Sequence, residues 1–361
     1  MLSEKEYIMW LSGLSKISHS KKDKLLHILG SAEDIYKAPE SLLKKINWLT
    51  ETNLEDITSN RDIDKLKRYA EKVYSLGADY IIKEDGYYPE ILREAYDAPL
   101  GFYLRGDKNV LLDKKVSMVG TRQATPYGVS AAMKLAEDFA AAGVCVVSGM
   151  ADGIDSASHR GALKGKGKTI AVLGCGINVC YPKTNEHLMK RIIENGCVIS
   201  EYPLDERANA RYFPERNRII AGLSMAVVVV EANEKGGSLI TANLAADFGR
   251  EIFALPGNIT SRASKGTNNL LKLGAAPITE AEDAFFAIGL DKEEAKKEPK
   301  EKITLENKEK MVYDCINPGE TALDEIIIKT GLDIAEVQLI LLNMEMSGVI
   351  KKLPASKYVC L

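Results

Sequence analysis

An alternation of short apolar runs with amphipathic stretches, between residues 78 and 288, most constrains the fold. The apolar runs cover residues 116–119, 144–147, 169–173, 198–199, 226–230 and 252–255. Such short runs, apolar on both faces, are typical of central parallel strands. Helical stretches such as 129–142, 187–194 and 239–248 lie between them. This alternation predicts right-handed βαβ units and an α/β, extended Rossmann-like, doubly wound and mostly parallel sheet over residues 78–288.

The first 77 residues show a different pattern, which predicts a small helical domain. Trp10, Leu11, Leu14 and Ile17 recur at helical spacing, and Gly13 is placed to end a helix. Residues 11–17 resemble a helix-hairpin-helix turn of the kind that presents backbone amides to DNA phosphates. We expect a small SAM-like or helix-hairpin-helix-like helical domain over residues 1–77. A DNA contact and a protein-interaction role of this domain both remain open.

The C-terminal part predicts a charged linker followed by a winged helix. Residues 289–304 are dominated by charge and contain one proline, so they cannot bury a core. Residues 305–361 then show three helical patterns and a short β wing. The third helix offers Glu336, Gln338, Asn343 and Glu345 in place of arginine or lysine. A protein-contact or dimer-regulating role is therefore at least as well supported as duplex readout.

Composition narrows the classes of function. The net charge of −3 means that any nucleic-acid binding must come from a local basic surface. The six cysteines form no CxxC pair, and the four histidines do not cluster, so we expect reduced thiols, no metal site and no cofactor. No apolar run approaches the roughly 20 residues of a membrane span, and the N-terminus lacks a signal-peptide layout. We expect a cytoplasmic protein without a membrane partner.

Several turns directly after predicted strands are suited to anions, because glycine allows close backbone approach and helix N-termini carry partial positive charge. Their candidate residues are Gly120, Thr121, Arg122, Ser148, Gly149, Lys183, Gly237 and Ser238. Lys183 is a candidate phosphate ligand or a solvated loop lysine. Gly237 and Ser238 form either an anion cradle or merely a tight turn. We therefore predict that anions bind where these turns follow the carboxyl ends of the strands.

Arg216, Asn217 and Arg218 interrupt an otherwise apolar run just before the strand at 226–230. Two guanidinium groups near buried backbone are costly unless an anion meets them. Arginine also fits a phosphate with two hydrogen bonds. We interpret the triplet as one wall of a phosphate-binding groove, and leave open whether one arginine instead pairs with Glu215 or Glu231.

No catalytic residue is predicted. Asp155 and His159 are four apart on a helical face and are either an acid–base pair or, in the favoured interpretation, a helix cap with local packing. The chain contains no nucleoside-triphosphate loop and no GxSxG nucleophile turn.

Six ordered motifs together resemble the DNA-processing protein family called DprA or Smf. They are VGTR at 119–122, SGMADGID at 148–155, SEYP at 200–203, FPERNRIIAG at 213–222, GSLITA at 237–242 and ALPG at 254–257. The resemblance implies a non-enzymatic protein that binds incoming single-stranded DNA during natural transformation. It also implies a homodimer that protects this DNA and helps to load the RecA recombinase onto it.

The resemblance also implies roles for particular residues. By motif, the DNA-contacting set is Gly120, Thr121, Arg122, Ser148, Gly149, Arg216, Asn217, Arg218, Gly237 and Ser238, with Lys183 a less direct match. Single strands are bound by basic grooves with stacking surfaces, for which Tyr181, Tyr212 and Phe213 are candidates. Asp152 departs from the family pattern and adds negative charge beside the groove.

Two other functions remain as alternatives. The fold and the turn at residues 236–238 also occur in nucleotide phosphoribohydrolases of the lysine-decarboxylase-like type, although no acid follows until Asp247. The other alternative is a regulatory or scaffold protein acting through the winged helix.

Overall fold

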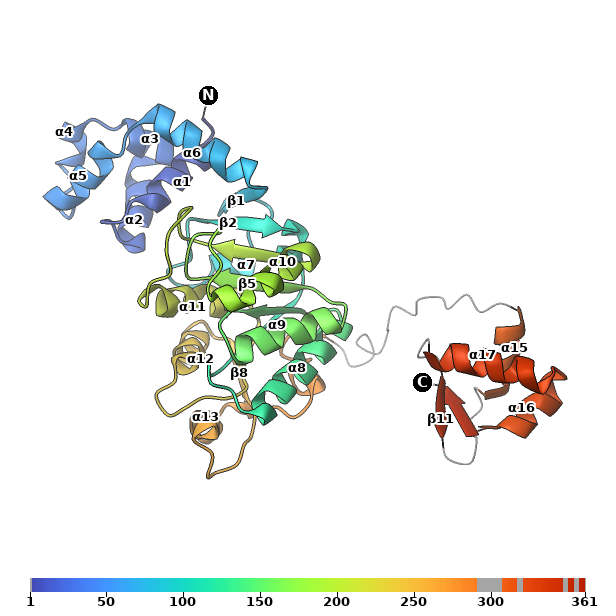
Figure 1. Ribbon diagram of the computed structural model, residues 1–361. Coiled ribbons are helices and arrows are strands. Elements are labelled where there is room, and N and C mark those ends of the chain that lie inside the picture. The colour runs from blue at the N-terminus through green and yellow to red at the C-terminus, as the bar shows by residue number, and fades with distance from the viewer. Residues whose placement is uncertain (1, 291–306, 317–320, 347–349, 354–356, 361) are drawn as a thin grey trace. The chain divides into compact units, whose positions relative to one another are not determined.

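The computed structural model describes residues 2–290, 307–316, 321–346, 350–353 and 357–360 (Figure 1). The chain divides into two compact units, Met1–Glu298 and Pro299–Leu361. The expected linker therefore lies almost entirely outside the described residues, and the expected boundaries at residues 77 and 288 stay predictions. Among the described residues, no helix has the length and apolar character required to cross a membrane.

The N-terminal part of the first unit is helical, as predicted. Its helices are α1 (Glu4–Gly13), α2 (His19–Leu29), α3 (Ala32–Lys37), α4 (Glu40–Leu43), α5 (Glu51–Ser59) and α6 (Ile63–Ser75). Local chemistry fixes several ends: Thr50 and Asp62 accept hydrogen bonds from the first turns of α5 and α6. Leu14 and Ile17 of the predicted hairpin turn are buried in the core.

A nine-stranded sheet follows, in the order β1-β2-β6-β5-β4-β3-β7-β8-β9. The strands are β1 (Ala78–Ile82), β2 (Gly101–Gly106), β3 (Lys115–Val119), β4 (Cys145–Ser148), β5 (Thr169–Leu173), β6 (Cys197–Ser200), β7 (Ala226–Val229), β8 (Glu251–Ala254) and β9 (Ala276–Pro277). All neighbours from β6 to β9 are parallel, whereas β1, β2 and β6 pair antiparallel. The predicted mostly parallel sheet is confirmed.

Helices cover both faces of the sheet, which makes it doubly wound (Figure 1). They are α7 (Glu90–Arg93), α8 (Pro126–Ala141), α9 (Ile154–Lys164), α10 (Glu186–Asn195), α11 (Tyr212–Leu223), α12 (Gly237–Asp247) and α13 (Lys265–Lys272). The residues of β3 alternate between the two cores: Met118 packs with α8 and α9, and Val119 with α11 and α12. Because β3 and β7 are neighbours whose following helices lead to opposite ends of the sheet, their carboxyl ends form the switch point at which such sheets bind ligands.

The second unit is a winged helix, as predicted. It contains α15 (Asn307–Ile316), β10 (Thr321–Ala322), α16 (Leu323–Thr330), α17 (Ile334–Met346), β11 (Ile350–Leu353) and β12 (Lys357–Cys360). The three strands pair antiparallel in the order β10-β12-β11. Gly331 ends α16 at φ 64°, the left-handed region that favours glycine. The third helix, α17, exposes Leu339 and Leu342.

Candidate nucleic-acid interface

The loops that follow the parallel strands meet at one side of the sheet, where the carboxyl ends of these strands lie. We call this side the edge of the sheet. The Thr121 amide, after β3, donates to the carbonyl of Glu231, after β7, at 2.8 Å. The Ile154 amide, after β4, donates to the Thr121 carbonyl at 3.2 Å. The predicted turns after β3 and β4 therefore lie together, beside the segment that follows β7.

A partly exposed aromatic and cationic face lies at this edge of the sheet. The Arg122 guanidinium carbon stands 4.7 Å from the Phe213 ring centroid, and the Tyr181 ring centroid is 5.5 Å from the same ring. Phe213 lies directly on the loop after β5, because a Cβ on Gly174 would fall 3.0 Å from its ring. Three elements thus bring together residues that the sequence separates. We call Arg122, Tyr181 and Phe213, with Lys183, the stacking face.

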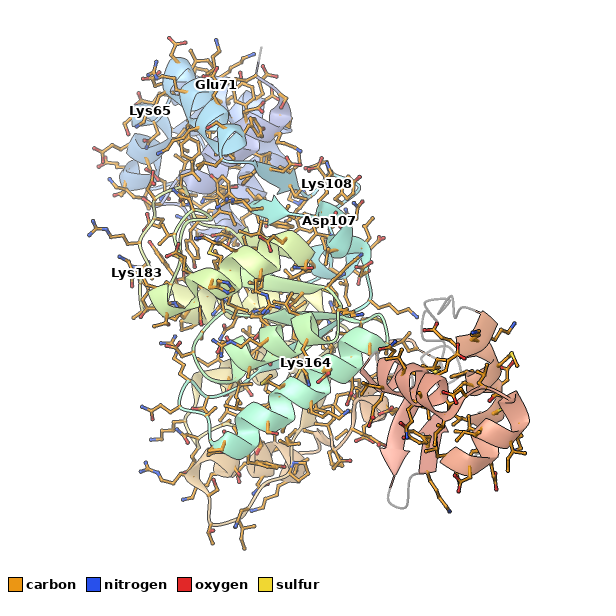
Figure 2. All side chains as sticks on the ribbon, turned by 45° about the vertical axis from the view of Figure 1, so that its right-hand side comes forward. Lys65, Glu71, Asp107, Lys108, Lys164 and Lys183 are labelled. Carbon is orange, nitrogen blue, oxygen red and sulfur yellow. The ribbon has the colours of Figure 1, made fainter. Side chains whose placement is uncertain are left out.

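Both cations of the stacking face are free to meet a ligand. Arg122 and Lys183 are exposed, and neither side chain makes a hydrogen bond or ion pair with another described residue. Lys183 lies at the margin of the first unit, which contains the nine-stranded sheet (Figure 2). A charged group with no partner inside the protein keeps its full capacity to bind a phosphate.

Arg216 is in a different situation. It is 4% exposed, and its Nη1 donates to the Gly149 carbonyl at 2.7 Å and also to the Val172 carbonyl. A Cβ on Gly149 would stand 2.5 Å from the guanidinium nitrogens, so only glycine permits this approach. Burial lowers the pKa of Arg216, which Asp155 opposes. The side chain ties α11 to the ends of β4 and β5.

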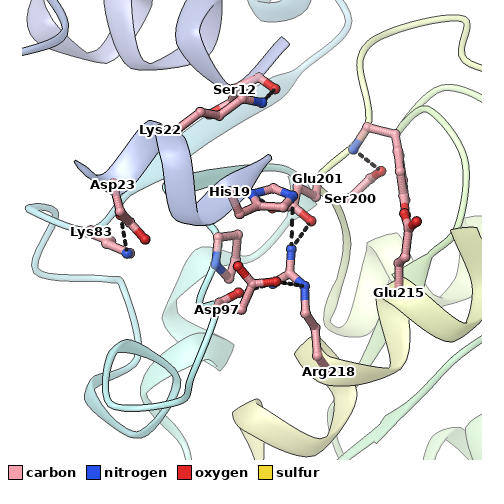
Figure 3. Close-up of polar contacts among 12 residues, drawn as sticks. Ser12, His19, Lys22, Asp23, Lys83, Asp97, Ser200, Glu201, Glu215 and Arg218 are labelled. Atoms are coloured by element: carbon pink, nitrogen blue, oxygen red, sulfur yellow. Dashed lines mark hydrogen bonds and ion pairs between the residues drawn. The ribbon is translucent and has the colours of Figure 1, made fainter. Parts of the chain in front are cut away.

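Arg218 is also bonded inside the protein, where Glu201 after β6 is its main partner (Figure 3). Its Nη2 bonds the Glu201 carboxylate, and its Nη1 donates to the Asp97 carbonyl at 2.6 Å. His19 of α2 stands 3.4 Å from both groups, through Nε2 to Arg218 and Nδ1 to Glu201. Burial works to lower the pKa of Arg218, and Glu201 outweighs it, so the pKa is raised.

The two buried arginines therefore have partners other than those considered from sequence. Glu215 and Glu231 bond neither of them; Glu201 and backbone carbonyls do. Asn217, between them, is half-buried. A phosphate contact by these three residues stays a prediction, since in this structure neither guanidinium is presented to solvent.

The remaining predicted residues line the same edge in different ways. Ser148 is buried and donates to the Met118 carbonyl at 2.6 Å. Gly120 packs against the Ile154 side chain. Gly237 and Ser238 begin α12, which packs beside α11, and Ser238 Oγ is buried without a partner among the described residues. Their contact with DNA stays a prediction.

The loop between β6 and α11, residues 201–211, adds residues that sequence reasoning missed. Arg207 and Arg211 are exposed, and Tyr202 stacks on Tyr212 with ring centroids 4.2 Å apart. The signal available in the sequence was the position of both arginines just before Phe213. They extend the cationic surface beside the stacking face.

Asp152 reduces the positive charge at this edge. It is exposed and accepts a hydrogen bond from the Thr184 hydroxyl at 3.3 Å, next to Lys183. The negative charge expected beside the groove is therefore present next to one of its cations.

Asp155 and His159 do not form an acid–base pair. His159 is fully buried; its Nδ1 bonds Thr169 Oγ1 at 2.7 Å, and this hydroxyl donates to the Val146 carbonyl. The ring must therefore donate to Thr169, and burial lowers the pKa of His159 to about 3. The favoured capping role was also wrong in detail, because Gly153 is the N-cap and Asp155 accepts from the Ala151 amide.

A hollow of about 480 Å³ lies at the switch point, beside Glu231. The Glu231 carboxylate accepts hydrogen bonds from Thr125 N at 2.9 Å and Thr125 Oγ1 at 2.5 Å, at the start of α8. A carboxylate thus occupies the helix N-terminus where a nucleotide phosphate would bind, and it repels one.

Comparison with known proteins supplies independent findings. The family described as DNA recombination-mediator protein A matches residues 79–289, and the DprA winged helix domain matches residues 296–356. Protein Smf of Synechocystis sp. is 31% identical over 90% of this chain and 91% of its own length. DNA processing protein DprA of Streptococcus pneumoniae is 42% identical over 56% of this chain and 71% of its own length.

Solved structures agree with these matches. The X-ray structure of DNA processing protein A from Streptococcus pneumoniae has a TM-score of 0.70 at 32% identity, covering 78% of this chain and 97% of its own. The Helicobacter pylori protein, described in terms of its single-stranded DNA binding mode, has a TM-score of 0.52 at 32% identity. It covers 58% of this chain and 94% of its own.

Proposed function

Because the chain belongs to the DNA-processing protein A (DprA, or Smf) family, we propose that it binds single-stranded DNA through the stacking face. The observation that carries the proposal is the exposed Arg122 guanidinium over the half-buried Phe213 ring, which lies beside the exposed Tyr181 ring. Stacking platforms next to cations bind single strands with little regard to sequence, because every base has a π-face. Bases stack on the rings while phosphates meet Arg122 and Lys183.

The geometry favours single strands over duplex DNA. A base reaches Phe213 or Tyr181 only when its own π-face is free, and a duplex keeps its bases stacked on one another. The winged helix offers the alternative route to a duplex, yet α17 carries no arginine or lysine. Single-strand binding by the sheet unit is therefore the stronger proposal.

We further propose that this binding serves natural transformation in the cytoplasm, as part of a homodimer that protects incoming DNA and helps to load the RecA recombinase. Support comes from the likeness to protein Smf, which covers about nine tenths of both chains, and from the family match. The burial of His159 and the hydrogen bond that Thr125 donates to Glu231 support a non-enzymatic role.

Titration with oligothymidylate and a matched duplex at several salt concentrations tests the proposal. We expect binding of the single strand at low salt, weaker duplex binding, and affinity that falls as salt rises, because neutralised phosphates release counterions. Absence of single-strand binding at low salt contradicts it. Removal of residues 302–361 should leave most single-strand affinity; its complete loss would favour the winged-helix alternative.

The phosphoribohydrolase alternative has its own test. Release of free base from a nucleoside monophosphate, abolished by Glu231→Gln or Asp247→Asn, would establish it. We expect no release, because the switch-point carboxylate already occupies the helix N-terminus.

A further inference from the structure

The loop at residues 201–211 is held from one side by the N-terminal helices. Tyr69 of α6 accepts a hydrogen bond from the Leu204 amide at 2.9 Å, and its hydroxyl is also 2.9 Å from that of Tyr103 in β2. Lys72, one turn further along α6, stands 2.6 Å from the Asp205 carboxylate. The helical domain thus contacts the loop through a tyrosine hydroxyl that accepts a hydrogen bond and through a charged side chain.

Asp205 also joins this loop to the one that carries Tyr181 and Lys183. The Asn178 side chain donates to the Asp205 carboxylate at 2.8 Å, and the Asp205 amide donates to the Asn178 side-chain oxygen at 2.8 Å. Asp205 has φ 63°, a left-handed conformation that aspartate and asparagine tolerate better than most residues. The Asp205 side chain therefore connects its own loop, residues 201–211, with α6 and with the loop that carries Tyr181 and Lys183.

The start of the same loop is fixed by a second set of contacts. Glu201 is bonded by Arg218 and lies 3.4 Å from His19 of α2, so the chain leaves β6 next to the N-terminal domain (Figure 3). At the other end, Tyr202 stacks on Tyr212, the first residue of α11. The segment before Phe213 is anchored at its start, middle and end.

We infer that Asp205 is a positioning residue for DNA binding, through which the N-terminal helices hold the Tyr181–Lys183 loop and the segment before Phe213 in one arrangement. The inference rests on the proposed function. A surface ordered before DNA arrives loses less conformational entropy on binding than one that must order itself. The N-terminal domain acts on DNA affinity without touching DNA.

Because Asp205 is negatively charged, the two explanations predict opposite changes in DNA affinity when its side chain is removed. The carboxylate is exposed and repels phosphates, so its removal would strengthen binding if electrostatics alone mattered. Positioning requires the opposite result. We expect Asp205→Ala to weaken oligothymidylate binding about fivefold while the dependence of log Kd on log salt stays unchanged, since no phosphate contact is lost.

Three further variants of the full chain complete the experiment. Asp205→Asn retains the acceptor for Asn178 and the tolerated φ, so it should recover most of the affinity. Tyr69→Phe removes the acceptor of the Leu204 amide without changing charge, and should weaken binding severalfold even if Asp205→Ala folds poorly. Asp152→Ala removes an exposed acid from the same edge and should leave binding equal or tighter.

The outcomes separate the two proposals. Unchanged or tighter binding by both Asp205→Ala and Tyr69→Phe, with the wild-type chain binding normally, overturns the positioning role alone. A wild-type chain that does not bind oligothymidylate at low salt overturns the proposed function and this inference with it. Weaker binding accompanied by a shallower salt dependence would mean that a cation–phosphate contact is lost in the variant, so that the effect is electrostatic, which also overturns the positioning role.

Discussion

The arginines on α11 and the arginine after β3 lie at the same edge of the sheet but have opposite surroundings. Arg216 and Arg218, on α11, are buried and bonded to carbonyls and to Glu201. Arg122, on the loop after β3, is exposed, and its guanidinium lies over the Phe213 ring. Arginine therefore stabilises the fold at positions 216 and 218, and remains available to a ligand at position 122.

The difference shows how the free-energy cost of burying a guanidinium group is offset. A guanidinium group inside a protein needs carboxylates or carbonyls as partners, and once it has them it has little left for a phosphate. We therefore expect substitutions on α11 to act mainly on stability, and substitutions on the stacking face to act mainly on DNA binding.

Arg218→Ala should have the largest effect, on stability. It leaves the buried Glu201 carboxylate without its main partner, which costs about 3–5 kcal/mol of unfolding free energy. Urea unfolding measures this. Arg211→Ala, an exposed arginine just before the same helix, is the matched control and should change stability by less than about 0.5 kcal/mol. Equal effects of the two variants would remove the contrast between buried and exposed arginines.

The buried His159 should make stability depend on pH. Its folded pKa is about 3, below its unfolded value of about 6.5, so the unfolded chain binds an extra proton between these values. Its contribution to stability is thus lost as pH falls below 6.5, by about 1.4 kcal/mol per unit. His159→Gln should flatten the unfolding free energy between pH 6.5 and 5 relative to the wild type. Parallel pH profiles would show that this histidine is not buried in its neutral form.

Phe213→Ala tests the aromatic half of the stacking face. Loss of base stacking should weaken oligothymidylate binding by about tenfold, or about 1.4 kcal/mol, which lies within the range of about 1–3 kcal/mol for one stacked base. Because no charge is removed, the salt dependence should stay the same. Tyr96→Ala, an exposed aromatic residue outside the face, serves as the control. Wild-type affinity in Phe213→Ala would exclude stacking at this ring.

Lys183→Ala should have the smallest effect. An exposed lysine contributes one flexible phosphate contact, so we expect a loss of affinity of about two- to fivefold and a slightly shallower salt dependence. Lys164→Ala removes an exposed lysine from α9, where it pairs with Glu137, and should leave binding unchanged. Identical binding curves for Lys183→Ala and the wild type would mean that this lysine is only solvated.

The sequence predicted the architecture well, because periodicity reports burial directly. The apolar runs correspond to β3 through β8, and the C-terminal pattern to a winged helix. Side-chain partners were harder to predict, since they depend on contacts between distant segments. Arg218 meets Glu201 and His19, which lie 17 and 199 residues away. Asp205 and its partners on α6 gave no sequence signal for the same reason.

The most direct test of the account compares Arg122→Ala with the wild-type chain in oligothymidylate titrations across a range of salt. If Arg122 meets a phosphate, the variant binds more weakly and the slope of log affinity against log salt falls by about 0.7, the value for one phosphate on a single strand. Its unfolding free energy should stay unchanged, because no bonded partner is lost. The same affinity and the same slope in both proteins would contradict DNA binding by the stacking face.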